Sequence, residues 1–166
     1  MTFQRILTLC MLLFVPLLPA QAATAPINDA AALQGVKEGK GVFLIDFSDP
    51  KKTAFYLEII RGTHAGLTRQ GVKPRFVVVY IGPTVRFLSS KPDDELELEQ
   101  GDALKAIAKQ VTELNKLGVR QEICAIATRV FKVPNETILP GLTLVGDGFI
   151  SLIGWQTQGY KLVPLF

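Results

Sequence analysis

Two short apolar runs, residues 42–47 and 75–81, constrain the fold of this chain more than any other feature. Both are rich in the β-branched and aromatic residues that pack well in strands. Because they lack the regular polar alternation of a strand with one face in water, they are typical of strands buried on both faces. Two such strands predict a sheet that is covered by helices on each side.

Helix signals follow each of these runs. Ser48 and Asp49 offer an N-cap, Pro50 suits the first helical position, and the pattern predicts a helix as far as about Gln70. A second, shorter helical piece is predicted after the second strand, over residues 82–88. The first half of the chain therefore alternates strand and helix.

The second half repeats this alternation. From Asp102 onward, apolar residues recur at the spacing of one helix face, and Gly118 supplies the stop signal. The further strands are expected at residues 119–124, 142–145 and 160–163, with a helix at 149–158. The expected fold class is therefore α/β, a three-layer α/β/α sandwich with a mainly parallel five-stranded sheet.

The first 22 residues have the features of a cleavable signal peptide. Arg5 is the only charge ahead of an apolar run at residues 6–18, and Ala20-Gln21-Ala22 has the small residues of a cleavage site. The run is short and broken by proline, so it does not suit a stable membrane span. We expect cleavage after Ala22, release into the periplasm, a flexible tether over residues 23–32 and a folded domain over residues 33–166.

The charge balance argues against nucleic acid as a partner. The formal net charge is +3 at pH 7, and loss of Arg5 with the signal peptide lowers it by one. Such a nearly balanced chain lacks the basic excess of nucleic-acid-binding domains.

Cys124 has the clearest potential for chemistry, since Cys10 lies within the expected signal peptide. It ends the third predicted strand and adjoins a helical turn, and a helix start stabilises a thiolate. Arg120 and Arg129 are near in sequence and add positive charge. The apolar residues 125–127 favour instead a buried, inert thiol. A reactive cysteine and a structural one both remain open interpretations at this point.

Ligand sites of parallel α/β sheets lie at the carboxyl ends of the strands. The loops expected there include Ser48, Gly82, Cys124 and the glycine-rich turn at residues 146–148. Free N–H groups of that turn could hold an anion or a thiolate; alternatively, its glycines only allow close packing. The candidate catalytic residue is Cys124, and the candidate ligand-binding residues are Ser48, Asp49, Gly82, Gly146, Asp147 and Gly148.

Three other features have structural explanations. Residues 35–41 are rich in glycine but lack the spacing of a phosphate-binding loop, so we expect a turn. Residues 89–100 are acidic, and we expect a solvated loop there rather than a metal site. His64, the only histidine, lies on the first helix, which runs away from the end of the third strand. We therefore expect no Cys–His pair, no metal and no cofactor.

Residues 70–88, 118–129 and 139–164 carry a more specific pattern. The last segment contains Leu139-Pro140-Gly141, the run SLIGWQ from Ser151 and then Gly159-Tyr160. These segments resemble the DsrE/DsrF-like family, in particular its exported branch. The resemblance implies a compact three-layer α/β/α domain that commonly oligomerises. For the cytoplasmic members it also implies sulfur carriage as a persulfide on a cysteine, and Cys124 stands at the matching position.

We therefore expect a periplasmic sulfur-relay-like protein that carries sulfur as a persulfide, or senses redox state, through Cys124. A sulfur donor or acceptor protein is then an expected partner. The alternative is a non-catalytic oligomeric module that binds a small ligand or a protein, with Cys124 buried and structural. Self-association is expected because apolar residues crowd the C-terminal region; these are Phe149, Ile150, Trp155, Tyr160, Leu165 and Phe166.

Overall fold

The computed structural model of the protein describes residues 27–165. Five strands form one sheet in the order β4-β3-β2-β1-β5, and every neighbouring pair is parallel. The strands are β1 (Glu38–Ile45), β2 (Lys73–Tyr80), β3 (Arg120–Cys124), β4 (Thr143–Val145) and β5 (Lys161–Val163). The predicted five-stranded parallel sheet is thereby confirmed.

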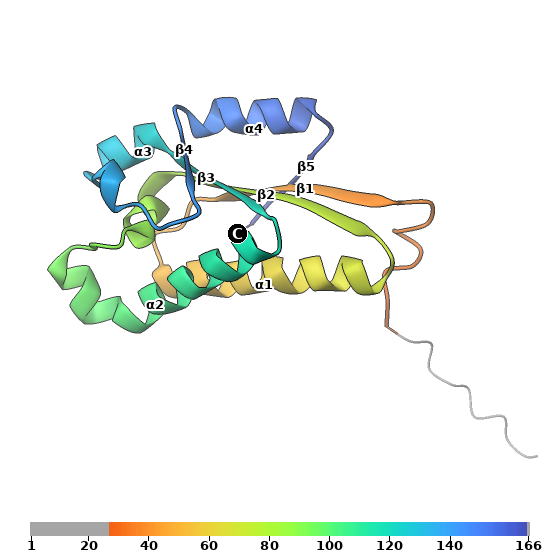
Figure 1. Cartoon of the computed structure of the whole chain (residues 1–166), viewed down its shortest axis with the longest axis horizontal. Helices are drawn as coiled ribbons and strands as arrows, with labels where there is room; N and C mark the ends of the chain where they lie inside the picture. The colour runs from red at the N-terminus through yellow and green to blue at the C-terminus, as the bar shows by residue number, and fades with distance from the viewer. Residues whose placement is uncertain (1–26, 166) are drawn as a thin grey trace, which may run out of the picture.

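Helices cover both faces of this sheet (Figure 1). The α-helices are α1 (Pro50–Arg69), α2 (Asp94–Lys116), α3 (Ala125–Val130) and α4 (Gly148–Thr157), and the 3-10 helices are η1 (Gly82–Leu88) and η2 (Asn135–Thr137). In Figure 1, α1 and α2 lie below the sheet and α4 lies above it, with α3 beside α4. The chain is therefore a three-layer α/β/α sandwich, as the sequence predicts.

The core lies around the two central strands that the apolar runs predict. β1 and β2 pair along their whole length, from Glu38 opposite Lys73 to Ile45 opposite Tyr80. Their carboxyl-terminal halves are almost entirely buried because α1 and α2 pack on one face and α4 on the other. Loss of this burial on unfolding is the main source of stability for such a domain.

The expected turn at residues 35–41 is wrong for its second half. Gly35 has the positive φ of a turn, at 76°, but β1 begins at Glu38 and includes Gly39 and Gly41. A Cβ at Gly39 would come within 2.8 Å of Leu67 Cδ1. Gly39 thus allows α1 to pack closely over the start of the sheet, a role that the local composition does not reveal.

The expected acidic loop at residues 89–100 is wrong from Asp94 onward, because α2 begins there, although most of the segment is exposed as expected. The Asp93 side chain caps this helix by accepting a hydrogen bond of 2.9 Å from the Leu96 N–H. Carboxylates in the first helical turn are stabilised by the positive end of the helix dipole, so the acidic residues favour helix here. The helix is kinked at Gln100, with φ −128° and ψ 15°, which explains why the apolar pattern becomes regular only beyond it.

A helix cap and a buried threonine fix the loops at the carboxyl end of the sheet. Asp49 caps α1 as predicted, accepting a hydrogen bond of 2.8 Å from the Lys51 N–H, and Pro50 is the first helical residue. Thr84 of η1 is fully buried and both accepts a hydrogen bond from the Phe47 N–H (2.6 Å) and donates one to the Phe47 carbonyl (2.9 Å). The β1–α1 loop and η1 are therefore held together at this edge.

The predicted signal peptide (residues 1–22) and residues 23–26 of the predicted tether lie outside the described residues. Within the described part, Asp29 exchanges two hydrogen bonds of 2.9 Å with the Gln70 side chain at the end of α1. None of the helices described over residues 27–165 is long and apolar enough to cross a membrane.

Candidate functional site at the carboxyl end of the sheet

Cys124 ends β3 and is the N-cap residue of α3. It carries a free thiol, and only 5 % of its surface is exposed. Its Sγ accepts a hydrogen bond from the backbone N–H of Gly148, at 3.3 Å. Gly148 is the first residue of α4, so its N–H has no acceptor within its own helix. The sulfur therefore occupies the position in which a helix start can stabilise negative charge.

The contact depends on the absence of a side chain at Gly148. A Cβ there would lie 2.6 Å from Ile81 Cγ2 and 3.3 Å from Cys124 Cβ. Only glycine lets α4 begin this close to the ends of the strands, and this approach brings the N–H to the sulfur. The close packing and the backbone donor to the sulfur are thus two consequences of one arrangement.

A pocket of about 260 Å³ opens beside the sulfur. Three of the predicted site residues line it, namely Cys124, Gly82 and Asp147. The other lining residues are Asp46, Ile81, Ile126, Ala127, Val130, Phe131 and Phe149. The pocket is thus mainly apolar, with two carboxylates at its wall.

Asp46 is the charged pocket residue that the sequence analysis missed. It is exposed, and its carboxylate lies against Gly82: a Cβ at Gly82 would fall 1.9 Å from Asp46 Oδ1. Gly82 also has a φ of 55°, which favours glycine. Asp46 is the only charged residue within the apolar run at 42–47, and that interruption at the end of a strand was the available signal.

The remaining predicted ligand residues lie elsewhere. Ser48 lines a different hollow, together with Arg86 and Glu99. The Asp49 carboxylate is occupied by capping α1. Gly146 is exposed and absent from the lining of the Cys124 pocket. Three of the expected loops therefore meet at the Cys124 pocket: η1, the start of α3 and the start of α4. The β1–α1 loop also reaches it, but with Asp46 instead of Ser48.

A buried carboxylate lies two residues before Cys124. Glu122 is only 2 % exposed, and its carboxylate accepts hydrogen bonds from Arg120 Nε, Ser151 Oγ and Trp155 Nε1, the last at 3.1 Å. Burial by itself raises the pKa of Glu122, but the hydrogen bonds from Ser151, Arg120 and Trp155 outweigh it, so the pKa lies below its ordinary value. Glu122 is therefore an anion that bonds β3 to α4.

Arg120, Arg129 and His64 are the other charged or titratable groups that the sequence brings into question near Cys124. Arg120 pairs with Glu122, and its guanidinium lies 5.6 Å from the centre of the Trp155 ring. Arg129 is exposed on α3. His64 packs edge-on against Phe76 of β2, with 5.8 Å between ring centres, and burial lowers its pKa. Within residues 27–165, the hydrogen-bond donor to the Cys124 sulfur is the Gly148 backbone N–H and not one of these side chains.

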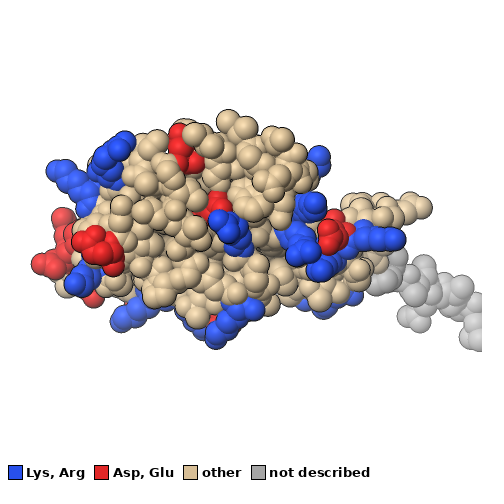
Figure 2. Space-filling model, turned by 45° about the horizontal axis from the view of Figure 1, so that its top comes forward, with Lys and Arg blue, Asp and Glu red and all other residues tan. Residues whose placement is uncertain are grey.

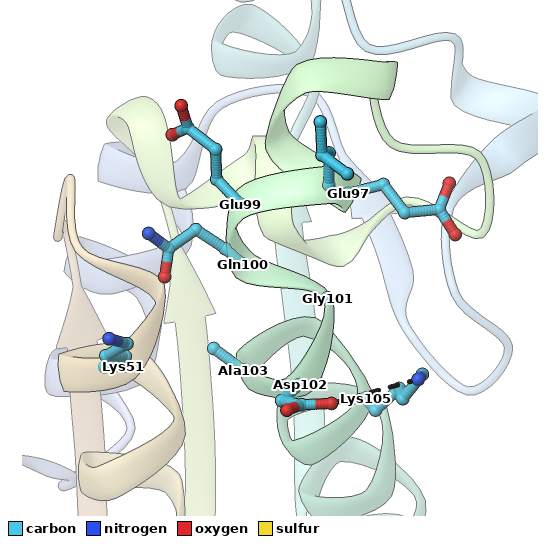
Figure 3. Close-up of a pocket in the computed structure, with 9 residues that line it drawn as sticks. Lys51, Glu97, Glu99, Gln100, Gly101, Asp102, Ala103 and Lys105 are labelled. Carbon is cyan, nitrogen blue, oxygen red and sulfur yellow. Dashed lines mark ion pairs between the residues drawn. The ribbon is translucent and has the colours of Figure 1, made fainter.

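A larger hollow at the kink of α2 has a different character (Figure 3). Its volume is about 390 Å³, and Lys51, Gln100 and Asp102 are among its lining residues. Figure 3 shows the side chains of Glu97 and Glu99 pointing in different directions, away from a common centre. Across residues 27–165, no three His, Cys, Asp or Glu side chains are grouped as metal ligands. The Cys124 pocket therefore remains the candidate functional site.

Fold and site together define a class of small α/β/α proteins with a cysteine at the carboxyl edge of a parallel sheet. The family model described as the DsrE/DsrF-like family matches residues 40–165. The chain therefore belongs to the DsrE/DsrF-like family, as its sequence pattern predicts. No match was found among curated proteins.

Solved structures of low sequence identity share the fold. A protein of unknown function, MTH1491 from Methanobacterium thermoautotrophicum, is 22 % identical with a TM-score of 0.60, over 78 % of this chain and 99 % of that one. The ychN protein from E. coli is 13 % identical with a TM-score of 0.53, over 76 % and 99 % of the two chains. The protein BT1422 of unknown function from Bacteroides thetaiotaomicron is 18 % identical with a TM-score of 0.51, over 80 % and 97 %.

Proposed function

We propose that the protein is a sulfur-relay protein that carries sulfur as a persulfide on Cys124, or responds to redox state through this thiol. The observation that carries the proposal is the hydrogen bond from the Gly148 N–H to Cys124 Sγ at the start of α4. A charged sulfur gains more from such a donor than a neutral thiol does. Membership of the DsrE/DsrF-like family, which relates to sulfur relay, supports the same function.

The transfer balances without an added oxidant when the donor is itself a persulfide. The Cys124 thiolate attacks the outer sulfur of the donor R–S–SH, so that a new S–S bond forms on Cys124. The S–S bond of the donor breaks, and the donor leaves as R–S⁻ with the bonding electron pair. The proton lost from the Cys124 thiol ends on the departing donor thiol at neutral pH. The same exchange in reverse delivers the sulfur to an acceptor thiol.

The first test combines alkylation with sulfur loading. Folded protein is treated with iodoacetamide over a range of pH, and separately with a small persulfide such as glutathione persulfide, with Cys124→Ser as the blank. We expect alkylation that remains fast in mildly acidic solution, and a gain of the mass of one sulfur atom that the serine variant does not show. A thiol that stays inert until the pH exceeds about 9, and takes up no sulfur, contradicts the proposal.

One observation favours a second function. Cys124 is 95 % covered, and the adjoining pocket is lined mainly by apolar side chains. This combination suits a module that binds a small apolar group or a protein side chain, with the cysteine as part of the wall. Thiol labelling separates the two functions: labelling only after denaturation supports the binding module, whereas labelling of the folded protein supports sulfur carriage.

We also propose that the protein associates with a second copy of itself through the outer face of α4. Phe149, Ile150 and Ile153 are 62–69 % exposed there. Figure 2 shows the face that carries α4, where most charged side chains gather towards the two ends, while a few acidic and basic side chains interrupt the otherwise uncharged area between. Phe149 also lines the Cys124 pocket, so a second copy on this face would border the site. Of the other expected residues, Trp155 and Tyr160 pack against each other, with 5.0 Å between ring centres.

Light scattering tests the self-association. We expect a mass above that of the monomer at micromolar concentration, and the monomer mass for Ile153→Lys. Lys105→Glu is the matched control because that residue is exposed on α2, on the opposite face of the sheet. A monomeric wild-type protein, or an assembly that Ile153→Lys leaves intact, contradicts this interface.

Finally, we propose that the protein works in the periplasm after cleavage behind Ala22. The support is the order of charge, apolar run and small residues at the start of the chain. N-terminal sequencing of protein from fractionated cells tests it. A chain that retains Met1 and fractionates with the cytosol contradicts the proposal.

A further inference from the structure

Helix α4 presents one stripe of residues to β3. Gly148, Ser151 and Trp155 follow one another at intervals of three and four, which places them on the same helix face. On β3, Glu122 and Cys124 are two residues apart and therefore share the face of the sheet that α4 covers. The stripe meets this face at two points: Gly148 donates to the Cys124 sulfur, while Ser151 and Trp155 donate to Glu122.

The two contacts differ in strength. Glu122 is a buried anion with three donors, and hydrogen bonds to charged groups are the stronger class. The contact at Cys124 is a single N–H···S hydrogen bond of 3.3 Å. The outer side of α4 carries exposed Phe149, Ile150 and Ile153, so no described helix holds it from that side. The carboxylate is therefore the main polar tie that fixes how α4 lies along β3.

We propose that Glu122 is a positioning residue, which fixes the register of α4 on β3 and thereby aims the Gly148 N–H at the Cys124 sulfur. This inference deepens the proposed function and rests on it where the reactivity of the thiol is concerned. Arg120 has a second part in the arrangement because it pairs with the Glu122 carboxylate. At about 3.3 Å per residue, Glu122 and Cys124 are only roughly 7 Å apart along the strand, so an unpaired carboxylate would oppose a thiolate.

The neighbouring residue on β3 provides a matched control. Gln121 is 1 % exposed and faces the opposite side of the sheet, where it accepts a hydrogen bond from Tyr80 Oη and donates to the Val111 carbonyl and Asn115 Oδ1. Gln121→Met and Glu122→Met each remove three side-chain hydrogen bonds from the same strand. Only the second change removes the link to α4. Ser151→Ala is a milder variant that removes only one donor from Glu122. It replaces Glu122→Met in the experiment if that variant fails to fold.

The direct readout is hydrogen exchange of the Gly148 amide, followed by NMR in the full chain. The first N–H of a helix has no intrahelical acceptor, and within residues 27–165 the Gly148 N–H has the Cys124 sulfur as its one hydrogen-bond partner. Cys124→Ala sets the exchange rate of the unprotected amide. We expect Glu122→Met and Ser151→Ala to speed the exchange by about tenfold, the order expected for loss of one hydrogen bond, while Gln121→Met leaves it within about twofold.

The second readout is the pH profile of Cys124 alkylation in the folded variants. We expect the profile to move to higher pH in Ser151→Ala, which keeps the charges of Glu122 and Arg120, and to stay in place in Gln121→Met, although the latter loses stability. Unchanged Gly148 exchange in both Glu122→Met and Ser151→Ala overturns the positioning role. Failure of the proposed function is seen separately, as a wild-type thiol that takes up no sulfur, and the exchange experiment still decides the role of Glu122 in that case.

Discussion

Replacing Gly148 by alanine tests the packing on which the site depends. The new methyl carbon would lie 2.6 Å from Ile81 Cγ2, 3.3 Å from Cys124 Cβ and 3.5 Å from Val79 Cγ1. Non-bonded carbon atoms prefer a separation of about 3.5–4.0 Å, so the start of α4 must move by roughly 1 Å. Val79 is fully buried and Ile81 nearly so, which means that the strand side of the contact cannot yield.

The expected size of the effect follows from two opposing contributions. Overpacking of a buried contact costs about 1–3 kcal/mol. Alanine offsets part of this because its unfolded chain has less conformational freedom than glycine, by up to about 1 kcal/mol. We therefore expect Gly148→Ala to lower the free energy of unfolding by about 1–2 kcal/mol, which corresponds to a fall in Tm of roughly 3–8 °C for a domain of this size.

The measurement is urea denaturation combined with the alkylation rate of Cys124. Gly154→Ala, on the same helix, is the control because a Cβ there meets nothing within 4 Å. This control should raise stability by about 0.5–1 kcal/mol through helix propensity alone. If Gly148→Ala is as stable as Gly154→Ala, the close approach of α4 to the strand ends does not require glycine and the packing argument is refuted.

Three further changes test the supports of the site. Thr84→Val should cost about 1–3 kcal/mol in urea denaturation, since it leaves both backbone groups of Phe47 without their buried partner; no loss would contradict the link between the β1–α1 loop and η1. Asp49→Ala removes the α1 cap and should lower the free energy of unfolding by about 1 kcal/mol, which a lower Tm would show. Asp49→Asn keeps a capping side chain and should leave Tm unchanged. Because the pKa of Glu122 is lowered by folding, its contribution is present above the ordinary carboxyl pKa of about 4.3 and is lost as the pH falls through the lower folded-state pKa. Unfolding free energies at several pH values should therefore fall less steeply on acidification in Glu122→Gln than in wild type, and equal slopes would count against the buried anion.

Local chemistry made much of the fold predictable. The apolar runs gave the two central strands because a strand covered on both faces needs no polar alternation. Asp49 and Pro50 marked the start of α1 correctly because capping involves only neighbouring backbone groups. The order of these elements along the chain was then enough to predict a parallel α/β sheet, since parallel strands need a crossover between them.

The acidic segment shows where local interpretation failed. Its carboxylates suggested a solvated loop, yet Asp93 caps a helix and the following carboxylates lie in its first turn. The kink at Gln100 interrupts the apolar periodicity, so the pattern indicated only the later part of α2. A helix that bends between two packed segments presents two faces, and a single period does not describe both.

The sequence by itself determined that a cysteine stands at the end of a strand, at the edge where parallel α/β folds place their sites. Tertiary structure alone decided what surrounds that cysteine. Gly148 is 24 residues from Cys124, and Ser151 and Trp155 are 29 and 33 residues from Glu122. Nothing local to β3 reveals that Glu122 is buried, because a charged residue in a strand is ordinarily exposed. Its burial is stable only after α4 has packed on the sheet and supplied the donors that compensate the lost hydration.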